Sequence, residues 1–306
     1  MRKKDIAEYN SIKQKLQNYT IKTLPGIVSA VNLDCFTWQM VDSVKRVKYV
    51  TTIRDKNISQ ICTNPNNNAF DPIKAASYYK SIGNIDEAFW LVFLAIHFGK
   101  NKKTKWALVR AVYSGLSNSV KWNWQTVKNN PKAFQQWLHI NKDSLKKAGS
   151  VGNHRKYISL NALGNSGTGA AVLSYVDWVT SQGGTHQVFF QNLFGAETNA
   201  KKKFNIAYKS MSQVRSFGRM GKFDYLTMIG KLQLVDIVPD SVYMVGATGP
   251  YSGAKFLFGG NPSRIELNNF LSDLEIHLGL DFGMQVLEDA ICNWNKNRSK
   301  YVYFGG

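Results

Sequence analysis

The apolar residues of this 306-residue chain recur every three or four positions, and the alternation typical of strands is scarce. Residues 5–19 place their large apolar side chains on one side of a helix. The run 88–98 follows an Asn-x-x-Glu sequence of the capping-box kind and ends before Gly99, which predicts a buried helix with His97 as a core residue. No βαβ rhythm and no internal repeat is visible. The sequence therefore predicts an all-α fold.

The charge of the chain points to a polyanionic partner. Lys and Arg number 39 against 20 Asp and Glu, which gives a formal net charge of +19 at pH 7. One basic cluster is usually a solvated loop, but several recur along this chain and favour nucleic acid over that alternative. We expect nucleic acid as the partner and no obligate protein partner. The clusters lie at 2–4, 100–105, 146–147, 155–156 and 201–203.

Cysteine usage and hydropathy indicate the cellular compartment in which the protein is expected. The three cysteines form no paired framework and no CxxC sequence, so we expect reduced thiols. The basic N-terminus lacks the apolar core of a signal peptide, and no apolar run is long enough to span a bilayer. We expect a soluble, cytoplasmic protein without a metal or other cofactor. The chain forms one catalytic domain over 1–306, or two helical lobes of about 1–150 and 151–306 with the active site between them.

The stretch 214–260 concentrates candidate functional residues. Asp224 precedes an apolar run at helical spacing, which predicts a position near a helix N-terminus, where a carboxylate is favoured. Arg219 and Lys222 flank it, an arrangement that suits stabilisation of a cation or activation of water. The alternative is a helix cap with solvated basic neighbours.

Candidate DNA contacts surround this stretch. Glycines before a helix allow backbone amides to approach a phosphate, and the turn 246–254 has this character. The turn lacks the spacing of a nucleotide P-loop or a dinucleotide fingerprint. If the motifs converge on one groove, phosphate contacts are expected from Arg155, Lys156, Arg215, Gly249, Gly253 and Lys255.

Two further clusters are candidates for binding the substrate. The polar sequence 152–157 offers Asn153 and His154 for a base edge, or is a surface loop. The last predicted helix, 283–296, carries Glu288, Asp289 and Asn293 beside its apolar stripe. The alternative for this second cluster is a network of side chains four residues apart that ties the C-terminal helix down.

Four segments carry a resemblance to a known family: GNHRKY at 152–157, FGRMGKFDYLTMIGKL at 217–232, GATGPYSGAKFLF at 246–258 and QVLEDAICNWNK at 285–296. They resemble the α-glutamyl/putrescinyl thymine pyrophosphorylase family, and most closely its bacterial clade, which includes an anti-phage DNA glycosylase. The resemblance runs from about Asp34 to the C-terminus. It implies an all-α fold related to the helix-hairpin-helix DNA glycosylases, acting on hypermodified pyrimidines in phage DNA.

The resemblance leaves two aspartates as candidates for catalysis. The glycosylase hairpin reads LPGVGxxTA, whereas 248–254 has one residue more before its alanine. The spacing from such a hairpin to the catalytic aspartate implies Asp273. Asp224, however, begins a predicted helix ending in KLQLV, much as the glycosylase aspartate begins a helix ending in RLGL. We favour Asp224 because its neighbours are cationic, and Asp273 is the rival.

Three functions follow as hypotheses. The first is a DNA glycosylase that flips a hypermodified pyrimidine, such as a glucosylated hydroxymethyl base, out of double-stranded phage DNA and leaves an abasic site. Arg219 and Lys222 are then expected to assist binding of the substrate. The second is a transferase that replaces a pyrophosphate on 5-hydroxymethyluracil with an amine or amino acid. The third is a non-enzymatic DNA-binding module that blocks phage replication by occupancy.

Overall fold

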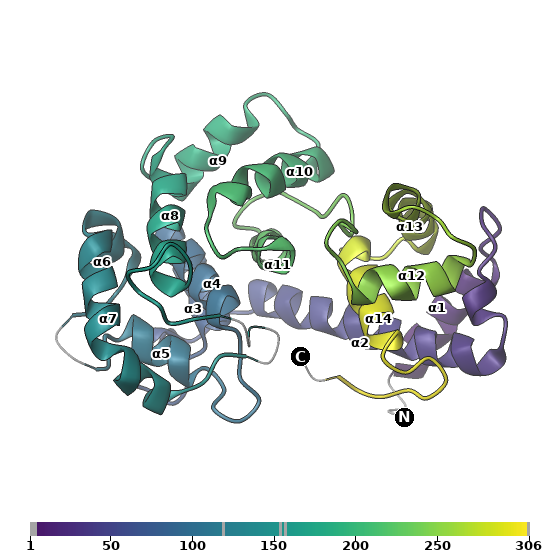
Figure 1. Cartoon of the computed structure of the whole chain (residues 1–306), viewed down its shortest axis with the longest axis horizontal. Coiled ribbons are helices and arrows are strands. Elements are labelled where there is room, and N and C mark those ends of the chain that lie inside the picture. The colour runs from purple at the N-terminus through teal and green to yellow at the C-terminus, as the bar shows by residue number, and fades with distance from the viewer. Residues whose placement is uncertain (1–4, 118–119, 153–154, 156–157, 305–306) are drawn as a thin grey trace. The chain divides into compact units, whose positions relative to one another are not determined.

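The computed structural model is all-α and describes residues 5–117, 120–152, 155 and 158–304 (Figure 1). Within these ranges no strand occurs, apart from an isolated bridge between Asn101 and Lys105. The predicted fold class is confirmed. The α-helices are α1 Ile6–Gln17, α2 Ala30–Asp55, α3 Pro72–Ser81, α4 Ile85–Phe98, α5 Ala107–Tyr113, α6 Trp124–Asn129, α7 Pro131–Ala148, α8 Thr168–Thr180, α9 His186–Phe194, α10 Ala200–Ser210, α11 Arg219–Lys231, α12 Gly249–Phe258, α13 Arg264–Leu278 and α14 Gly283–Trp294, with 3₁₀ turns at Pro25–Ile27, Gln60–Thr63 and Met211–Gln213.

The chain divides into two compact units whose limits differ from the halves at about residue 150. Unit 1 combines both ends of the chain, Met1–Tyr49 and Val238–Gly305, and unit 2 is the central part, Val50–Ile237. The expectation of a single catalytic domain with a site between two lobes stays a prediction. In the described part of the chain, no helix combines the length and the apolarity needed to cross a membrane.

Unit 1 packs α12, α13 and α14 with α1 and the first part of α2 around one apolar core. Ser263 caps α13 in a capping box with Glu266, as the sequence predicts. Close approach of α12 and α14 depends on Gly253, because a Cβ there would lie 2.6 Å from Cγ2 of Ile291. The C-terminal segment after α14 continues this unit, and Val302 contributes a carbonyl that accepts from Gln39 at 2.8 Å.

Unit 2 is built around α4, which is buried along almost its whole length. A helix that is apolar on every side needs neighbours on every side, and α3, α5, α6, α9 and α11 supply them. The predicted helix and its end at Gly99 are confirmed. The capping box at its start is wrong. Asn84 is the N-cap residue without a side-chain hydrogen bond, and Glu87 turns inward to accept from the Tyr113 hydroxyl and the Trp124 amide.

A buried polar chain fixes α11 within unit 2. The Asp86 carboxylate on α4 accepts from the amide of His186 at 2.8 Å and from its Nδ1 at 2.6 Å. Nε2 of this histidine lies 2.7 Å from the Tyr175 hydroxyl on α8, which lies 2.7 Å from the Tyr225 hydroxyl on α11. A fully connected buried network rigidifies the elements that it joins. The middle of α11 therefore has a defined position relative to α4 and α8.

Candidate functional site

A cavity of about 450 Å³ lies within unit 2. Its wall combines the end of α4, the start of α8 with the chain before it, and the turn that leads into α11. A volume between about 300 and 1,000 Å³ is typical of sites for small organic groups. The lining residues are Ile96, His97, Arg155, Ile158, Ser159, Ser166, Gly167, Ser216, Phe217, Gly218, Met220 and Gly221.

Two residues in left-handed conformations hold this wall together. Gly167 has a φ of +96°, and a Cβ there would lie 3.0 Å from the Ser159 carbonyl oxygen, so the position requires glycine. Ser216 has a φ of +60°, which is uncommon for a residue with a side chain. Its hydroxyl accepts a hydrogen bond from the Gly167 amide at 2.8 Å. The strained serine thus ties the turn before α11 to the start of α8, and such strain clusters at functional sites.

His97, on the last turn of α4, is a buried neutral residue in the cavity wall. Its Nε2 lies 3.0 Å from the Thr168 hydroxyl. Burial, reinforced by the positive charge of Arg155, lowers the pKa of His97 to about 3. The imidazole is therefore uncharged at physiological pH. The sequence-based assignment of His97 to the core is correct, and the structure adds its place at the cavity, which no sequence pattern signals.

Arg155 and Asp224 form an ion pair beside the cavity. The Arg155 Nε donates to the Ile96 carbonyl at 2.7 Å, and its Nη2 pairs with Oδ2 of Asp224. The arginine side chain is 11% exposed and the aspartate side chain 31%. No described residue donates to the other carboxylate oxygen, Oδ1. Asp224 is therefore held through one oxygen and open through the other.

The N-terminus of α11 presents unpaired amides to the same cavity. Gly218 is the N-cap residue and provides no side-chain hydrogen bond. Within the described part of the chain, the amides of Met220 and Gly221 have no hydrogen-bond partner. The partial positive charge of a helix N-terminus favours acceptors and anions there. At the start of α8, by contrast, the Thr168 and Gly169 amides are already bound to backbone carbonyls.

The prediction that Asp224 lies at a helix N-terminus is wrong. Because α11 begins at Arg219, Asp224 lies in its second turn. The glycine at 221 lies within the helix, and a Cβ there would lie 3.1 Å from Cδ1 of Phe217. The partner of the carboxylate is Arg155, which is therefore an internal ion-pair residue rather than an exposed cation. Lys222 donates instead to the Ser212 hydroxyl at 2.9 Å.

The structure describes only some of the other unit 2 residues that the sequence predicts to bind DNA or substrate. Arg219 is the first residue of α11, and Arg215 is exposed in the turn before it. Both lie close in sequence to residues of the cavity wall. Asn153, His154 and Lys156 lie outside the described residues.

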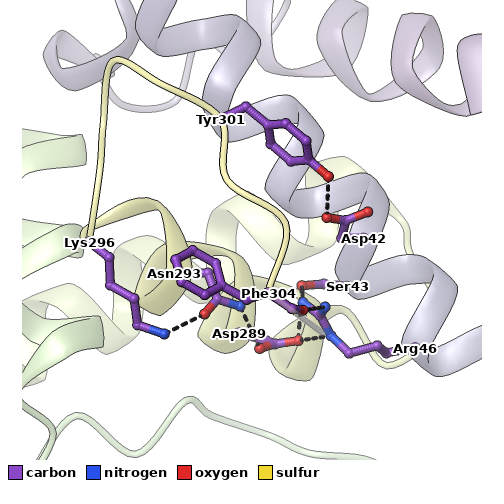
Figure 2. Close-up of polar contacts among 8 residues, drawn as sticks. All are labelled: Asp42, Ser43, Arg46, Asp289, Asn293, Lys296, Tyr301 and Phe304. Atoms are coloured by element: carbon purple, nitrogen blue, oxygen red, sulfur yellow. Dashed lines mark hydrogen bonds and ion pairs between the residues drawn. The ribbon is translucent and has the colours of Figure 1, made fainter. Parts of the chain in front are cut away.

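Three of the predicted substrate-binding residues belong to α14 of unit 1, and two of them form part of a polar network (Figure 2). Asp289 Oδ2 accepts from Nε of Arg46 at 2.6 Å and from the Ser43 hydroxyl at 3.1 Å, and its Oδ1 accepts from Asn293 at 3.1 Å. Lys296 donates to Asn293 at 2.8 Å. These contacts correspond to the alternative considered from the sequence, a network of side chains that ties the C-terminal helix down. Glu288, the third, is buried.

The remaining predicted residues also lie in unit 1. Asp273 is on α13, and Lys255 on α12 donates to the side chain of Asn261. Gly249 and Gly253 belong to α12 itself, which starts at Gly249. A Cβ at Gly249 would lie 3.0 Å from the Cys292 sulfur, and Gly253 faces α14 with even less space. Both glycines therefore serve packing within unit 1, and their predicted DNA contacts stay predictions.

Comparison with known families identifies the chain. Residues 31–306 match the family described as alpha-glutamyl/putrescinyl thymine pyrophosphorylase clade 3. The chain belongs to this family. No curated protein and no solved structure gave a match. The family is named for an enzymatic activity on thymine, and the matched region contains every residue of the cavity wall and the whole of α11.

Proposed function

We propose that the protein is a DNA glycosylase that removes a hypermodified pyrimidine from double-stranded phage DNA, as an anti-phage defence. One observation carries the proposal: the Asp224 carboxylate, fixed by Arg155 and open at Oδ1, stands beside a cavity of about 450 Å³. Asp224 shares a face of α11 with Met220 and Gly221, one turn earlier, and both of these line the cavity. The membership of a thymine-modification family and the charge of +19 support DNA as the substrate.

The cavity is the proposed pocket for the extruded base. An enzyme that acts on a base within a duplex turns the nucleotide out of the stack and holds it between apolar and aromatic surfaces. The Phe217 ring lines the cavity and supplies such a surface. Arg215, which is exposed in the turn before α11, is the proposed contact to a neighbouring phosphate.

Cleavage of the C1′–N1 bond leaves the bonding electrons on the base and positive charge on the sugar. Asp224 stabilises the sugar cation and directs water to C1′, and its open Oδ1 accepts a proton from that water. The departing base gains negative charge and is later protonated at N1. The amides of Met220 and Gly221 at the start of α11 offset that charge. Arg155 acts as a positioning residue, because it sets the orientation of the carboxylate.

The decisive assay supplies glucosylated phage DNA and unmodified DNA in parallel and measures released base and alkali-labile abasic sites. We expect release from the modified DNA only. If neither DNA loses a base, the glycosylase proposal fails.

The same α11 amides and Arg155 favour a second candidate. A helix N-terminus beside a guanidinium is a suitable cradle for a pyrophosphate group. A transferase would use it to hold the pyrophosphate that an amine displaces from 5-hydroxymethyluracil, with Asp224 accepting a proton from the amine. Mass spectrometry of digested nucleosides separates the two: a new adduct with release of pyrophosphate indicates transfer, and a free base indicates excision.

A helix-hairpin-helix arrangement is also part of the proposal, at a place other than the predicted 246–254. Helices α10 and α11 are consecutive, pack through the rings of Phe204 and Phe223 and are joined by residues 211–218. Counted from Gly221, a spacing like the one that implied Asp273 reaches Asp240 instead. Asp240 therefore joins Asp224 and Asp273 as a carboxylate to be tested.

A further inference from the structure

The imidazole of His97 is held rigidly in the cavity wall. Its ring is nearly parallel to the Phe93 ring, with centroids 5.7 Å apart and an interplanar angle of 5°, and to the Phe217 ring, with centroids 5.7 Å apart and an angle of 10°. The side chain is 1% exposed. The two phenylalanine rings also pack against each other, with centroids 5.0 Å apart. His97 and Phe217 line the same cavity.

The hydrogen bonds of Thr168 fix which nitrogen of His97 carries the hydrogen. The Thr168 hydroxyl donates to the Ser159 carbonyl at 2.9 Å, so its single hydrogen is already used. Toward His97 Nε2, at 3.0 Å, it is an acceptor, and Nε2 is therefore the N–H. In a neutral imidazole the other nitrogen, Nδ1, then holds a lone pair. Burial and the Arg155 charge keep the ring neutral.

Nδ1 is a buried acceptor to which no residue in the described part of the chain donates. Buried polar groups nearly always have a hydrogen-bond partner. An unpaired acceptor in a cavity wall therefore indicates a ligand that supplies the missing donor. We propose that His97 Nδ1 accepts a hydrogen bond from an N–H on the Watson–Crick edge of the pyrimidine in the cavity. His97 is thus a specificity-determining residue. This inference rests on the proposed base-binding role of the cavity.

The start of α11, which lines the same cavity, complements this acceptor. The amides of Met220 and Gly221 are donors without described partners and suit a carbonyl oxygen or another acceptor of the base. An acceptor at His97 and donors at α11 together match an edge on which an N–H lies beside an acceptor. Both kinds of pyrimidine have such an edge: a uracil-type base through N3–H and a cytosine-type base through its 4-amino group.

Methylated bases test the inference with the unaltered protein. The probes are duplexes with a single 5-hydroxymethyluracil or its 3-methyl derivative, and with 5-hydroxymethylcytosine or its N4,N4-dimethyl derivative. Each target lies opposite an abasic analogue, so that no base pair distinguishes the probes. A 2′-fluorinated sugar blocks excision, so that binding is measured by itself. Leaving a buried acceptor unpaired is expected to weaken binding on the order of ten- to a hundredfold.

The two arms identify the donor. A loss confined to the 3-methyl probe assigns the donor to the imide of a uracil-type base. A loss confined to the dimethyl probe assigns it to the amino group of a cytosine-type base. Equal binding of methylated and unmethylated probes overturns the role of His97 while the proposed function stands. If the excision assay with glucosylated phage DNA releases no base, the proposed function fails, and this inference with it.

Two variants add an independent readout. In His97→Gln the side-chain amide occupies the position of Nε2 and still donates to Thr168, but nothing replaces Nδ1. In His97→Asn the amide oxygen occupies the position of Nδ1 and retains the acceptor. We expect the glutamine variant to lose discrimination against the methylated probe and the asparagine variant to keep it. A glutamine variant that folds and still discriminates overturns the proposal, and if it does not fold, the probes with the unaltered protein decide.

Discussion

Each unit contains an arginine–aspartate ion pair whose aspartate is a candidate from the sequence analysis. The two pairs differ in how many oxygens of the aspartate have a described partner. Arg46–Asp289 in unit 1 and Arg155–Asp224 in unit 2 have aspartate side chains of similar exposure, 29% and 31%. Asp289 has partners at both oxygens, from Arg46, Ser43 and Asn293 (Figure 2). Asp224 has a described partner at Oδ2 alone.

This difference separates a structural carboxylate from one that is able to react. Asp289 is held at both oxygens by described partners, whereas Asp224 is held in orientation at Oδ2 and has no described partner at Oδ1. A charged group that acts in electrostatic catalysis needs a fixed orientation and an atom that is still able to interact with the substrate. Exposure alone would have ranked the two aspartates as equals.

The largest expected effect is that of Asp224→Asn. Asparagine retains an oxygen that accepts from Arg155, so the fold should persist, but the charge that stabilises the sugar is lost. We expect turnover to fall about a hundred- to a thousandfold. The matched control, Asp289→Asn, should leave turnover near that of the unaltered protein and lower its thermal stability. Single-turnover excision and thermal unfolding of both variants measure the contrast.

Asp273→Asn and Asp240→Asn extend this test to the other two carboxylates. Should either abolish excision while Asp224→Asn remains active, the spacing from a hairpin was the better guide. The difference between the two ion pairs would then have no catalytic meaning.

A second, smaller effect is expected from the arginines. Arg155→Ala removes the group that orients Asp224, and misplacing a catalytic group by about 1 Å costs up to about a hundredfold in rate. We expect kcat to fall with little change in KM. Arg46→Ala should instead lower the free energy of unfolding by about 1.5–3 kcal/mol, typical of lost hydrogen bonds to a charged group, and leave kcat unchanged. A rise in KM and a lower salt dependence for Arg155→Ala would show a phosphate contact instead.

The sequence predicted the helices better than the site. Periodicity and end signals were sufficient for α4, which stops at Gly99, and for the Ser263 capping box, because both depend on residues close in sequence. The start of α11 was missed, because the apolar spacing that indicates this helix in the sequence follows Asp224, whereas the helix begins at Arg219. Similarly, the glycines of α12 suggested amides for phosphate. Their close approach to α14 depends on a distant segment.

The pairing of Arg155 with Asp224 was beyond sequence reasoning. The two residues are 69 positions apart, and local charge made Arg219 and Lys222 the natural partners of the carboxylate. His97 shows the same limit. Its place in an apolar run correctly indicated burial, but only the fold brings it beside Thr168 and leaves one nitrogen without a donor among the described residues.

A third prediction concerns pH, because the cavity wall contains a buried neutral imidazole. The pKa of His97 falls from 6.5 to about 3 on folding, so the unfolded chain binds more protons between these values. Its contribution to stability is complete above pH 6.5 and is lost as the pH falls toward 3. Between pH 6.5 and about 3, the free energy of unfolding of the unaltered protein should fall as the pH falls. We expect His97→Gln to reduce this slope by up to about 1.4 kcal/mol per pH unit. Urea titrations at several pH values test this, and parallel curves would contradict the burial of a neutral His97.

The smallest expected effect separates an exposed arginine from the paired ones. Arg215 is exposed in the turn before α11, and we expect it to neutralise a DNA phosphate. Reversing its charge in Arg215→Glu should weaken binding to modified and unmodified DNA alike and reduce the slope of log affinity against log salt by about one. Excision from a saturated complex should stay unchanged, because the residue acts on association with the backbone and not on C1′. Binding at several salt concentrations measures the slope. If only modified DNA binds more weakly, Arg215 contacts the base or its adduct. The assignment of Arg215 to the DNA backbone, in contrast to Arg155 beside the cavity, is then wrong.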